Sequence, residues 1–368
     1  MTHRPDPMKT RILFILGLAL VLVSSPLAPA QETTPPSTTP SATVPDPETI
    51  EEKIAFKREA KVLYGSIVVV DHEGVTHASA NGVQDIKTKT PNSIDTQFQI
   101  GTLTRFFTQI MILKLVEQGK IDLDASLATY LPEFDADVAS AVTIRHLYRM
   151  ESGLPKERAG AVGIELDANG MAWPALCKLE LTLETVPGTK KTSSNLGYWV
   201  LGGVIEKVTG QPYFEALKTN ILDPVGMQNT GMGSAWRLNK GAKAAATGHK
   251  YKDGTLKKIA WGQFDKRYAS GGLYSTAPDL AKLVGALASD ELLSTDSLNL
   301  HHQLRAKDGK LPNAAPFYSG IASGYASILT YDLESGTCVV ILNNIAPEKA
   351  KGFKRTARKL LRKAKKVE

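Results

Sequence analysis

The sequence predicts an α/β protein in which an antiparallel sheet is flanked by helices and carries an inserted helical lobe. Residues 60–90 and 315–345, near the two ends of the chain, each contain a pattern typical of a β-hairpin, and helical periodicity prevails between them. The two ends are therefore expected to pair in one sheet, while the long middle segment forms the lobe. A cleft between sheet and lobe is the expected place for a functional site.

Residues 1–30 have the pattern of a secretory signal peptide. Lys9 and Arg11 precede an apolar run at residues 12–23, and the small side chains at residues 28–30 suit a cleavage site. The run is shorter than the roughly 20 apolar residues that a membrane-spanning helix needs. We therefore expect cleavage rather than a retained anchor, and an exported protein that is periplasmic or extracellular.

A segment rich in Pro and Thr follows at residues 31–47. It has almost no apolar side chains to offset the entropy cost of ordering, so we expect a disordered linker. The folded domain is predicted at residues 48–346. Its first element is a hairpin at residues 64–83, with a turn at residues 71–74.

The middle of the domain shows apolar residues at helical spacing. The helices predicted from this spacing are residues 104–118, 143–150, 196–208, 213–220 and 277–287.

A second hairpin is predicted at residues 325–344, with a turn at residues 333–336. Cys338 lies in its apolar second strand. The sequence leaves open whether Cys338 forms a disulfide with Cys177, the one other cysteine of the chain.

A basic segment ends the chain at residues 347–368. From residue 348 onward there are ten Lys and Arg against two Glu, a net charge of +8, whereas the whole chain carries +7. Apolar residues at helical spacing predict an amphipathic helix. Either its apolar face packs on the domain and its charged face is solvated, or residues 349–366 bind an anionic surface. Few aromatic residues accompany the charges, so nucleic acid is not an expected partner.

A small polar pattern opens the predicted helix at residues 104–118. Thr102 and Arg105 are three residues apart, so both project from the same side of the first turn. A hydroxyl followed three residues later by a basic group is the arrangement in which Lys assists deprotonation of a nucleophilic Ser. Alone, this spacing is a weak signal because such pairs are common.

Short motifs accompany this pattern in a fixed order between residues 63 and 344. They include Gly82-Val83-Gln84-Asp85, Tyr130-Leu131-Pro132, Ser152-Gly153-Leu154-Pro155, Pro187-Gly188-Thr189, Pro224-Val225-Gly226-Met227 and Gly271-Gly272-Leu273-Tyr274. Together they resemble the serine β-lactamase and penicillin-binding-protein family, particularly its class C branch and the related esterases and D-aminopeptidases. The resemblance implies the β-lactamase/transpeptidase-like fold.

In that family the helix turn carries a nucleophilic Ser and a Lys, and the matching positions here hold Thr102 and Arg105. A threonine hydroxyl can still attack, although its methyl group crowds the approach. Arg has a pKa above about 12 and stays protonated, so it cannot accept the hydroxyl proton. Neutralising it near pH 7 would cost at least about 7 kcal/mol. The first catalytic motif has therefore lost its base.

The family's other two motifs are also changed. Its Tyr-x-Asn motif matches Ser193-Ser194-Asn195, where Asn195 is kept but Ser193 lacks the reach and acidity of a phenol. Its Lys/His-Thr/Ser-Gly motif, on a strand at the edge of the cleft, matches Tyr318-Ser319-Gly320. Tyr318 therefore stands where the resemblance implies a cation or an imidazole.

We therefore predict a catalytically inactive member of the family, which binds a cell-wall peptide, a small carboxylate or a partner in the former cleft. The expected ligand contacts are Arg105, Asn195, Tyr318 and Ser319. One alternative is a weak or rewired esterase, D-aminopeptidase or β-lactam hydrolase, with Thr102 as nucleophile and Arg105 clamping a substrate carboxylate. Another is a surface-anchoring module that uses the basic C-terminal helix.

No cofactor or metal is expected. His301 and His302 are adjacent, so they do not share a face of a regular element, and no acidic or Cys ligand stands at metal spacing. We interpret both as solvent-exposed histidines.

Overall fold

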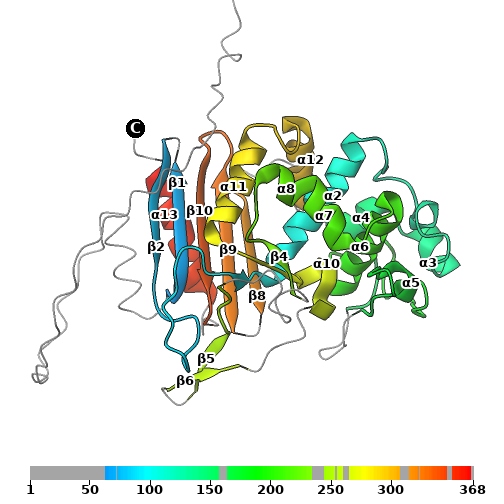
Figure 1. Cartoon of the computed structure of the whole chain (residues 1–368). Coiled ribbons are helices and arrows are strands. Elements are labelled where there is room, and N and C mark those ends of the chain that lie inside the picture. The colour runs from blue at the N-terminus through cyan, green and yellow to red at the C-terminus, as the bar shows by residue number, and fades with distance from the viewer. Residues whose placement is uncertain are drawn as a thin grey trace, which may run out of the picture. The chain divides into compact units, whose positions relative to one another are not determined.

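A computed structural model gives the fold (Figure 1). It describes residues 63–71, 73–156, 164–233, 244–252, 255–259, 265–306, 315–322, 324–345 and 350–365. These residues all belong to one compact unit. The predicted signal peptide at residues 1–30 and the predicted linker at residues 31–47 lie outside the described residues, as do the first residues of the predicted domain.

A five-stranded antiparallel sheet is built from both ends of the chain, as predicted. Its strand order is β2-β1-β10-β9-β8, so N-terminal β1 lies beside C-terminal β10 (Figure 1). The pairing is in register over long stretches, for example Val68 with Val340 and Val340 with Leu329. The strands are β1 Gly65–Asp71, β2 Gly74–Ala80, β8 Phe317–Ala322, β9 Tyr325–Asp332 and β10 Thr337–Asn343.

Both faces of the sheet are buried because successive side chains of a strand point to opposite faces and most of those of the central strands are apolar. Val68, Val340 and Leu329 face the helical part of the molecule and belong to the main core. Their neighbours Val69 and Ile341 face the other way and pack under α13 (Ala350–Ala364). A continuous apolar run in each central strand is the sequence pattern of a sheet covered on both sides.

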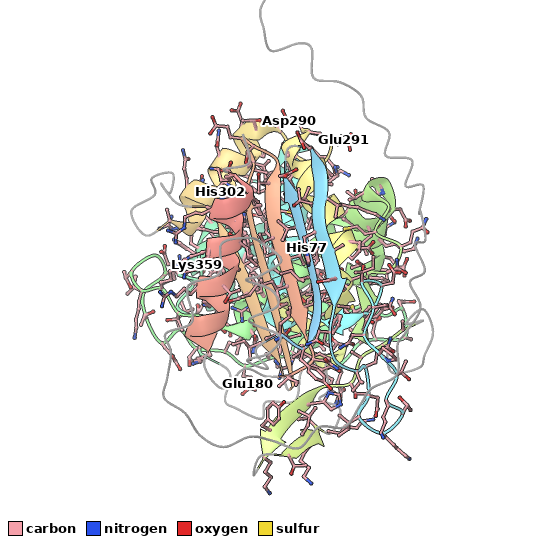
Figure 2. All side chains as sticks on the ribbon, turned by 90° about the vertical axis from the view of Figure 1, so that its left-hand side faces the viewer. His77, Glu180, Asp290, Glu291, His302 and Lys359 are labelled. Atoms are coloured by element: carbon pink, nitrogen blue, oxygen red, sulfur yellow. The ribbon has the colours of Figure 1, made fainter. Side chains whose placement is uncertain are left out.

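The basic C-terminal segment is the helix α13, which lies across this second face (Figure 2). Its Ala357, Leu360, Leu361 and Ala364 are at most 3% exposed. The prediction of an amphipathic helix with its apolar face on the domain is confirmed.

The central helix of the lobe is α2 (Thr104–Glu117), most of whose residues are buried. It packs against α6 (Asn195–Thr209), which Ser194 caps at its N-terminus and Gly210, at a φ of 68°, ends. The remaining helices are α3 Ala136–Ala141, α4 Ile144–Arg149, α5 Trp173–Leu176, α7 Tyr213–Leu217, α8 Asp223–Val225, α10 Tyr268–Gly271, α11 Ala277–Ala288 and α12 Thr295–Arg305.

Shorter elements complete the domain. A small three-stranded sheet has the order β3-β7-β4 and a hairpin pairs β5 with β6. These strands are β3 Phe98–Gln99, β4 Gly231–Met232, β5 His249–Lys252, β6 Thr255–Lys258 and β7 Leu273–Ser275. The helical turns are η1 Gly101–Leu103, η2 Leu127–Thr129, η3 Lys218–Leu222 and η4 Asp265–Arg267.

The predicted helices agree with these elements, with one difference. The helix predicted at residues 213–220 is α-helical only to Leu217, and the π-helical turn η3 follows. Cys177 and Cys338 are both free thiols, so no disulfide links the lobe to the sheet. Within the described ranges, no helix has the length and apolar character needed to cross a bilayer.

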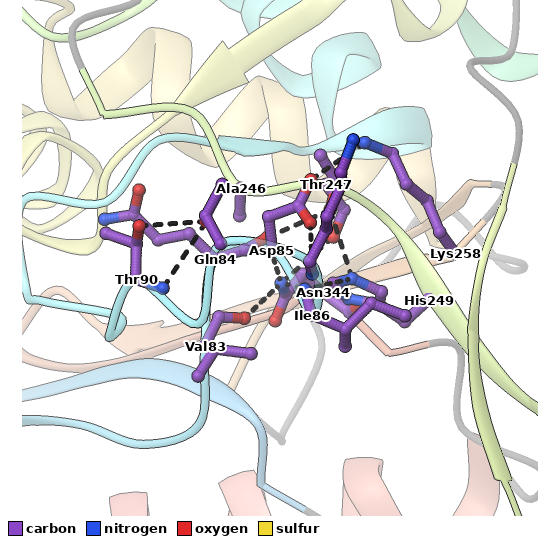
Figure 3. A network of polar contacts seen from close by, with 12 residues as sticks. Val83, Gln84, Asp85, Ile86, Thr90, Ala246, Thr247, His249, Lys258 and Asn344 are labelled. Carbon is purple, nitrogen blue, oxygen red and sulfur yellow. Dashed lines mark hydrogen bonds and ion pairs between the residues drawn. The ribbon is translucent and has the colours of Figure 1, made fainter.

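A buried polar network, which we call the Asn344 network, joins the loop after β2 to the start of β5 and the end of β10 (Figure 3). The Asn344 side-chain amide donates to the carbonyl groups of Val83, Gln84 and Thr247 at 2.9, 3.2 and 3.0 Å. The backbone N–H of His249 donates to the Asn344 carbonyl at 2.8 Å. Asn344 and His249 are both fully buried. Three segments far apart in the sequence are held together here.

Candidate functional site

The turn that carries Thr102 is pressed against the edge strand β8. Gly101 has a φ of +53°, and the chain enters α2 through η1. A Cβ atom on Gly320 would lie 1.8 Å from the Ile100 carbonyl oxygen, so only glycine lets β8 approach this closely. The hydroxyl of Ser327 on β9 donates to the same carbonyl at 2.7 Å. This packing fixes Thr102 beside β8.

Thr102 is partly exposed. Its side chain makes no hydrogen bond to another residue in the described part of the chain. A hydroxyl nucleophile needs a group that removes its proton, and the partner that the spacing supplies is Arg105.

Arg105 brings the first two motifs together in what we call the Arg105 cluster: Arg105, Ser193, Asn195 and Tyr198. Its guanidinium donates to the Ser193 hydroxyl oxygen at 3.0 Å and to the Asn195 side-chain carbonyl at 2.7 Å. It lies 4.6 Å from the centroid of the Tyr198 ring, which is buried. Stacking and two directed hydrogen bonds stabilise the charged form of a guanidinium.

The N-terminus of α6 positions the two acceptors. The hydroxyl of Ser194 accepts from the Leu196 backbone N–H at 3.1 Å and donates to the Pro155 carbonyl at 3.1 Å. Ser193 before this cap is exposed, whereas Asn195 after it is partly buried. The Arg105 cluster is therefore exposed to solvent at Ser193, and on the side of the buried Tyr198 ring it is shielded from solvent.

Further cations lie near this cluster. Arg305, at the end of α12, donates to the side-chain carbonyl of Gln109 at 3.0 Å, one helical turn beyond Arg105 on α2. Lys191 donates to the Arg305 backbone carbonyl at 3.1 Å. Burial lowers the pKa of Lys191, and the charges of Arg149 and Arg305 lower it further against the opposing effect of Glu151.

Glu151 is already paired. It accepts from Arg149 through both carboxylate oxygens, at 2.7 and 3.1 Å. Among the residues that the structure describes here, Arg105, Lys191 and Arg305 therefore leave an excess of positive charge on this side of the lobe. An anionic group is the complementary ligand.

Tyr318 differs from its predicted role. Its side chain is 4% exposed, and its hydroxyl lies 2.6 Å from His301 Nε2 and 3.3 Å from the Tyr331 hydroxyl. The Arg305 guanidinium covers its ring at 4.3 Å. The ring of Phe106 also packs against it, with the centroids 4.1 Å apart. Tyr318 is thus a core residue in this structure rather than a contact of the Arg105 cluster.

Ser319 also lies apart from the cluster. It pairs with Ile328, whose side chain belongs to the sheet face under α13, and paired residues point to the same face. Of the four residues predicted to contact a ligand, the structure therefore brings together Arg105 and Asn195 and separates Tyr318 and Ser319 from them.

The interpretation of both histidines as solvent-exposed is wrong for His301. Its ring is 1% exposed, and its Nδ1 lies 2.6 Å from the Tyr148 hydroxyl while Nε2 meets Tyr318. Burial lowers the pKa of His301 well below its ordinary value, so the ring is neutral and bridges two phenols. His302 is partly buried, and burial lowers its pKa to about 4.

The spacing of apolar residues along α12 could have predicted that His301 is buried. His301 stands three residues after Leu298 and three before Leu304, on the apolar stripe of the helix. The predicted helices do not include α12, so neither the burial of His301 nor the position of Arg305 near the cluster is anticipated.

Comparisons with known proteins agree with this architecture. A family model described as Beta-lactamase matches residues 50–363. Teichoic acid D-alanine hydrolase of Staphylococcus aureus is 28% identical over 258 residues, which are 70% of this chain but only 62% of the length of that relative.

Two solved structures show the same fold. FmtA from Staphylococcus aureus superposes with a TM-score of 0.72 at 23% identity, covering 86% of this chain and 89% of that one. A penicillin binding protein from Bacillus halodurans superposes with a TM-score of 0.67 at 24% identity, covering 80% and 95%.

Proposed function

The chain belongs to the β-lactamase family of serine-hydrolase-related proteins, and we propose that it is a catalytically inactive member that binds a carboxylate ligand at the Arg105 cluster. The single observation that carries this proposal is the pair of hydrogen bonds from Arg105 to Ser193 and Asn195. They join one position of the first family motif to two positions of the second around a permanently charged group.

Loss of catalysis follows from the state of Arg105. A guanidinium has donors but no acceptor, and stacking on Tyr198 further favours its charged form. Among the described residues, no basic side chain forms a hydrogen bond with the Thr102 hydroxyl, and the Arg105 guanidinium donates to Ser193 and Asn195 instead. General-base assistance typically contributes about 10²- to 10⁴-fold to such reactions, and this contribution is missing here.

Carboxylate binding follows from the geometry of the same group. A guanidinium has five N–H donors, and the hydrogen bonds to Ser193 and Asn195 use two of them, so a carboxylate can be added as a further acceptor at this charged group. Arg305 and Lys191 add positive charge nearby, and the neighbouring Glu151 is neutralised by Arg149. We propose that the ligand is a cell-wall-type peptide ending in D-alanine; the hydrolase from Staphylococcus aureus, named for teichoic acid D-alanine, makes this residue the first to test.

The binding test compares one peptide in two forms. We expect N-acetyl-D-alanyl-D-alanine to bind measurably by isothermal titration, and its C-terminal amide to bind at least about tenfold more weakly because the amide lacks the charge. Arg105→Gln should abolish the difference. Arg355→Gln removes an equally charged side chain from the exposed face of α13 and should leave the difference between acid and amide unchanged. Equal affinity for acid and amide in the wild-type protein would contradict a carboxylate site.

A weak hydrolase that uses Thr102 is the second candidate. It is favoured by the placement of Thr102, which η1 holds beside β8 with its side chain partly exposed. In this case Arg105 would orient a substrate carboxylate rather than act as a base.

Intact-mass measurement after incubation with a fluorescent penicillin or an activated ester separates the two candidates. We expect no adduct with the wild-type protein and labelling of the variant Thr102→Ser/Arg105→Lys/Ser193→Tyr. A wild-type adduct that turns over and disappears in Thr102→Ala would instead establish Thr102 as a nucleophile.

We also propose that the protein is exported and acts in the periplasm or outside the cell. The signal-like leader and the linker in the sequence support this location. Mass spectrometry of the mature protein should then find an N-terminus close to residue 31.

A further inference from the structure

The outward face of the helix α13 is strongly basic. Between Ala350 and Ala364 the sequence has seven Lys and Arg and no acidic residue. Arg355, Arg358 and Arg362 are exposed. No carboxylate in the described ranges pairs with any of these three, whereas Lys365 is held by Asp332 at 3.1 Å. These three arginines form the feature that we call the arginine stripe.

The arginine stripe is a regular array. Its members are three and four residues apart and therefore lie along one side of the helix. At about 1.5 Å of rise per residue, the stripe is about 10 Å long with about 5 Å between successive side chains. Arg358 also lies 5.3 Å from the ring centroid of Phe317, which anchors the middle of the row to β8.

The opposite side of α13 is buried against the five-stranded sheet. Ala357, Leu360 and Leu361 are buried against Ile67 and Val339 of the sheet. A membrane-binding amphipathic helix inserts its apolar face into the lipid, and α13 has no such face to offer unless it leaves the domain. Figure 2 shows the helix lying on the sheet, with Lys359 on it.

We propose that the arginine stripe binds a linear polymer of repeating phosphodiesters, such as an anionic polymer of the cell surface. Arg side chains spaced about 5 Å apart can each meet a successive phosphate, and the guanidinium fork suits phosphate oxygens. Single-stranded nucleic acid also carries phosphodiesters, but its binding sites normally add several aromatic side chains for base stacking. The sequence of α13 has one aromatic residue, Phe353.

This inference does not rest on the proposed function. The main core, which contains α2, packs on one face of the sheet, and α13 covers the other. Polymer binding and peptide binding should therefore be independent, and failure of one leaves the other standing.

The test measures the affinity of the full chain without its leader for synthetic poly(glycerol phosphate). We expect binding that weakens at least roughly tenfold between about 50 and about 200 mM salt, as three phosphate contacts predict. The variant Arg355→Gln/Arg358→Gln/Arg362→Gln should lose at least about tenfold in affinity at the lower salt concentration.

A matched control keeps the test specific. Lys250→Gln/Lys252→Gln/Lys257→Gln removes the same charge from exposed positions of the β5–β6 hairpin and should bind like the wild type. An equal loss of affinity in this control would mean that binding depends only on the net charge of the protein, and it would overturn the proposal. So would tighter binding to phosphatidylglycerol vesicles or poly-uridylate than to the polymer, or no binding at about 50 mM salt.

Discussion

The Asn344 network and the Arg105 cluster use the same kinds of side chain in opposite ways. Both combine an asparagine with hydroxyl groups and a cation. In the Asn344 network the asparagine is 0% exposed and its amide is shared among three backbone carbonyls (Figure 3). In the Arg105 cluster the asparagine is partly exposed and its side-chain carbonyl faces a cation beside exposed Ser193.

The charges differ in the same way. Lys258 at the rim of the Asn344 network is paired with Asp85 at 2.8 Å, so that network is close to neutral. Beside the Arg105 cluster, the carboxylate of Glu151 is used by Arg149, and Arg305 adds a further positive charge. A closed, neutral polar network holds segments together, whereas an open one with excess charge is suited to a ligand.

The largest expected effect is the loss of the Asn344 side chain. Asn344→Ala leaves the carbonyls of Val83, Gln84 and buried Thr247 without that donor, so we expect the free energy of unfolding to fall by about 3 kcal/mol. Asn195→Ala is the matched variant in the open cluster and should cost less than about 1 kcal/mol. Urea unfolding measures both. Equal losses would show that the Arg105 cluster is as structural as the Asn344 network.

A smaller effect is expected from the phenol of Tyr318. Tyr318→Phe removes the hydroxyl that meets His301 and Tyr331, so it should lower the free energy of unfolding by about 1 to 2 kcal/mol. Because Tyr318 does not contact the Arg105 cluster, affinity for the D-alanyl peptide should not change. A weakened affinity with unchanged stability would restore Tyr318 to the ligand-binding role that the sequence predicts.

The case of Tyr318 shows where sequence reasoning ends. The two hairpins and the central helix follow from short-range periodicity, and the spacing of Thr102 and Arg105 follows from one helical turn. Periodicity also says that Tyr318 and Ser319 point to opposite faces of β8. Tyr318 is the one that faces the lobe, and His301 and Arg305 of α12 bury it there. Contacts with α12 are a tertiary property that the pattern of β8 does not contain.

The Asn344 network could not be predicted from the sequence for a related reason. Its hydrogen bonds join residues up to 261 positions apart, and although Val83 and Gln84 belong to one quoted motif, no pattern in the sequence connects that motif with Thr247, His249 or Asn344. The cluster of Arg105 with Ser193 and Asn195, 88 and 90 positions away, was predictable only because each belongs to a motif of the family that the sequence resembles.

The smallest expected effect concerns the rim of the Asn344 network. The hydrogen bond from Lys258 is the main cause that lowers the pKa of Asp85, to about 2 from its ordinary value of 3.8. The Lys258 side chain is 42% exposed, so Lys258→Gln should cost only about 0.5 kcal/mol at neutral pH.

The pH dependence of this small effect has a definite sign. A carboxylate whose pKa is lower in the folded protein than in the unfolded chain stabilises the fold at pH values above the unfolded pKa, and this contribution is lost as the pH falls through the folded value. The difference between wild type and Lys258→Gln should therefore be constant above about pH 5 and should shrink from about pH 4 toward pH 2. Urea midpoints measured across this range provide the test. A difference that stays constant down to about pH 2 would mean that Lys258 stabilises the hairpin through its alkyl chain and that the rim, unlike Asn344, takes no part in the network.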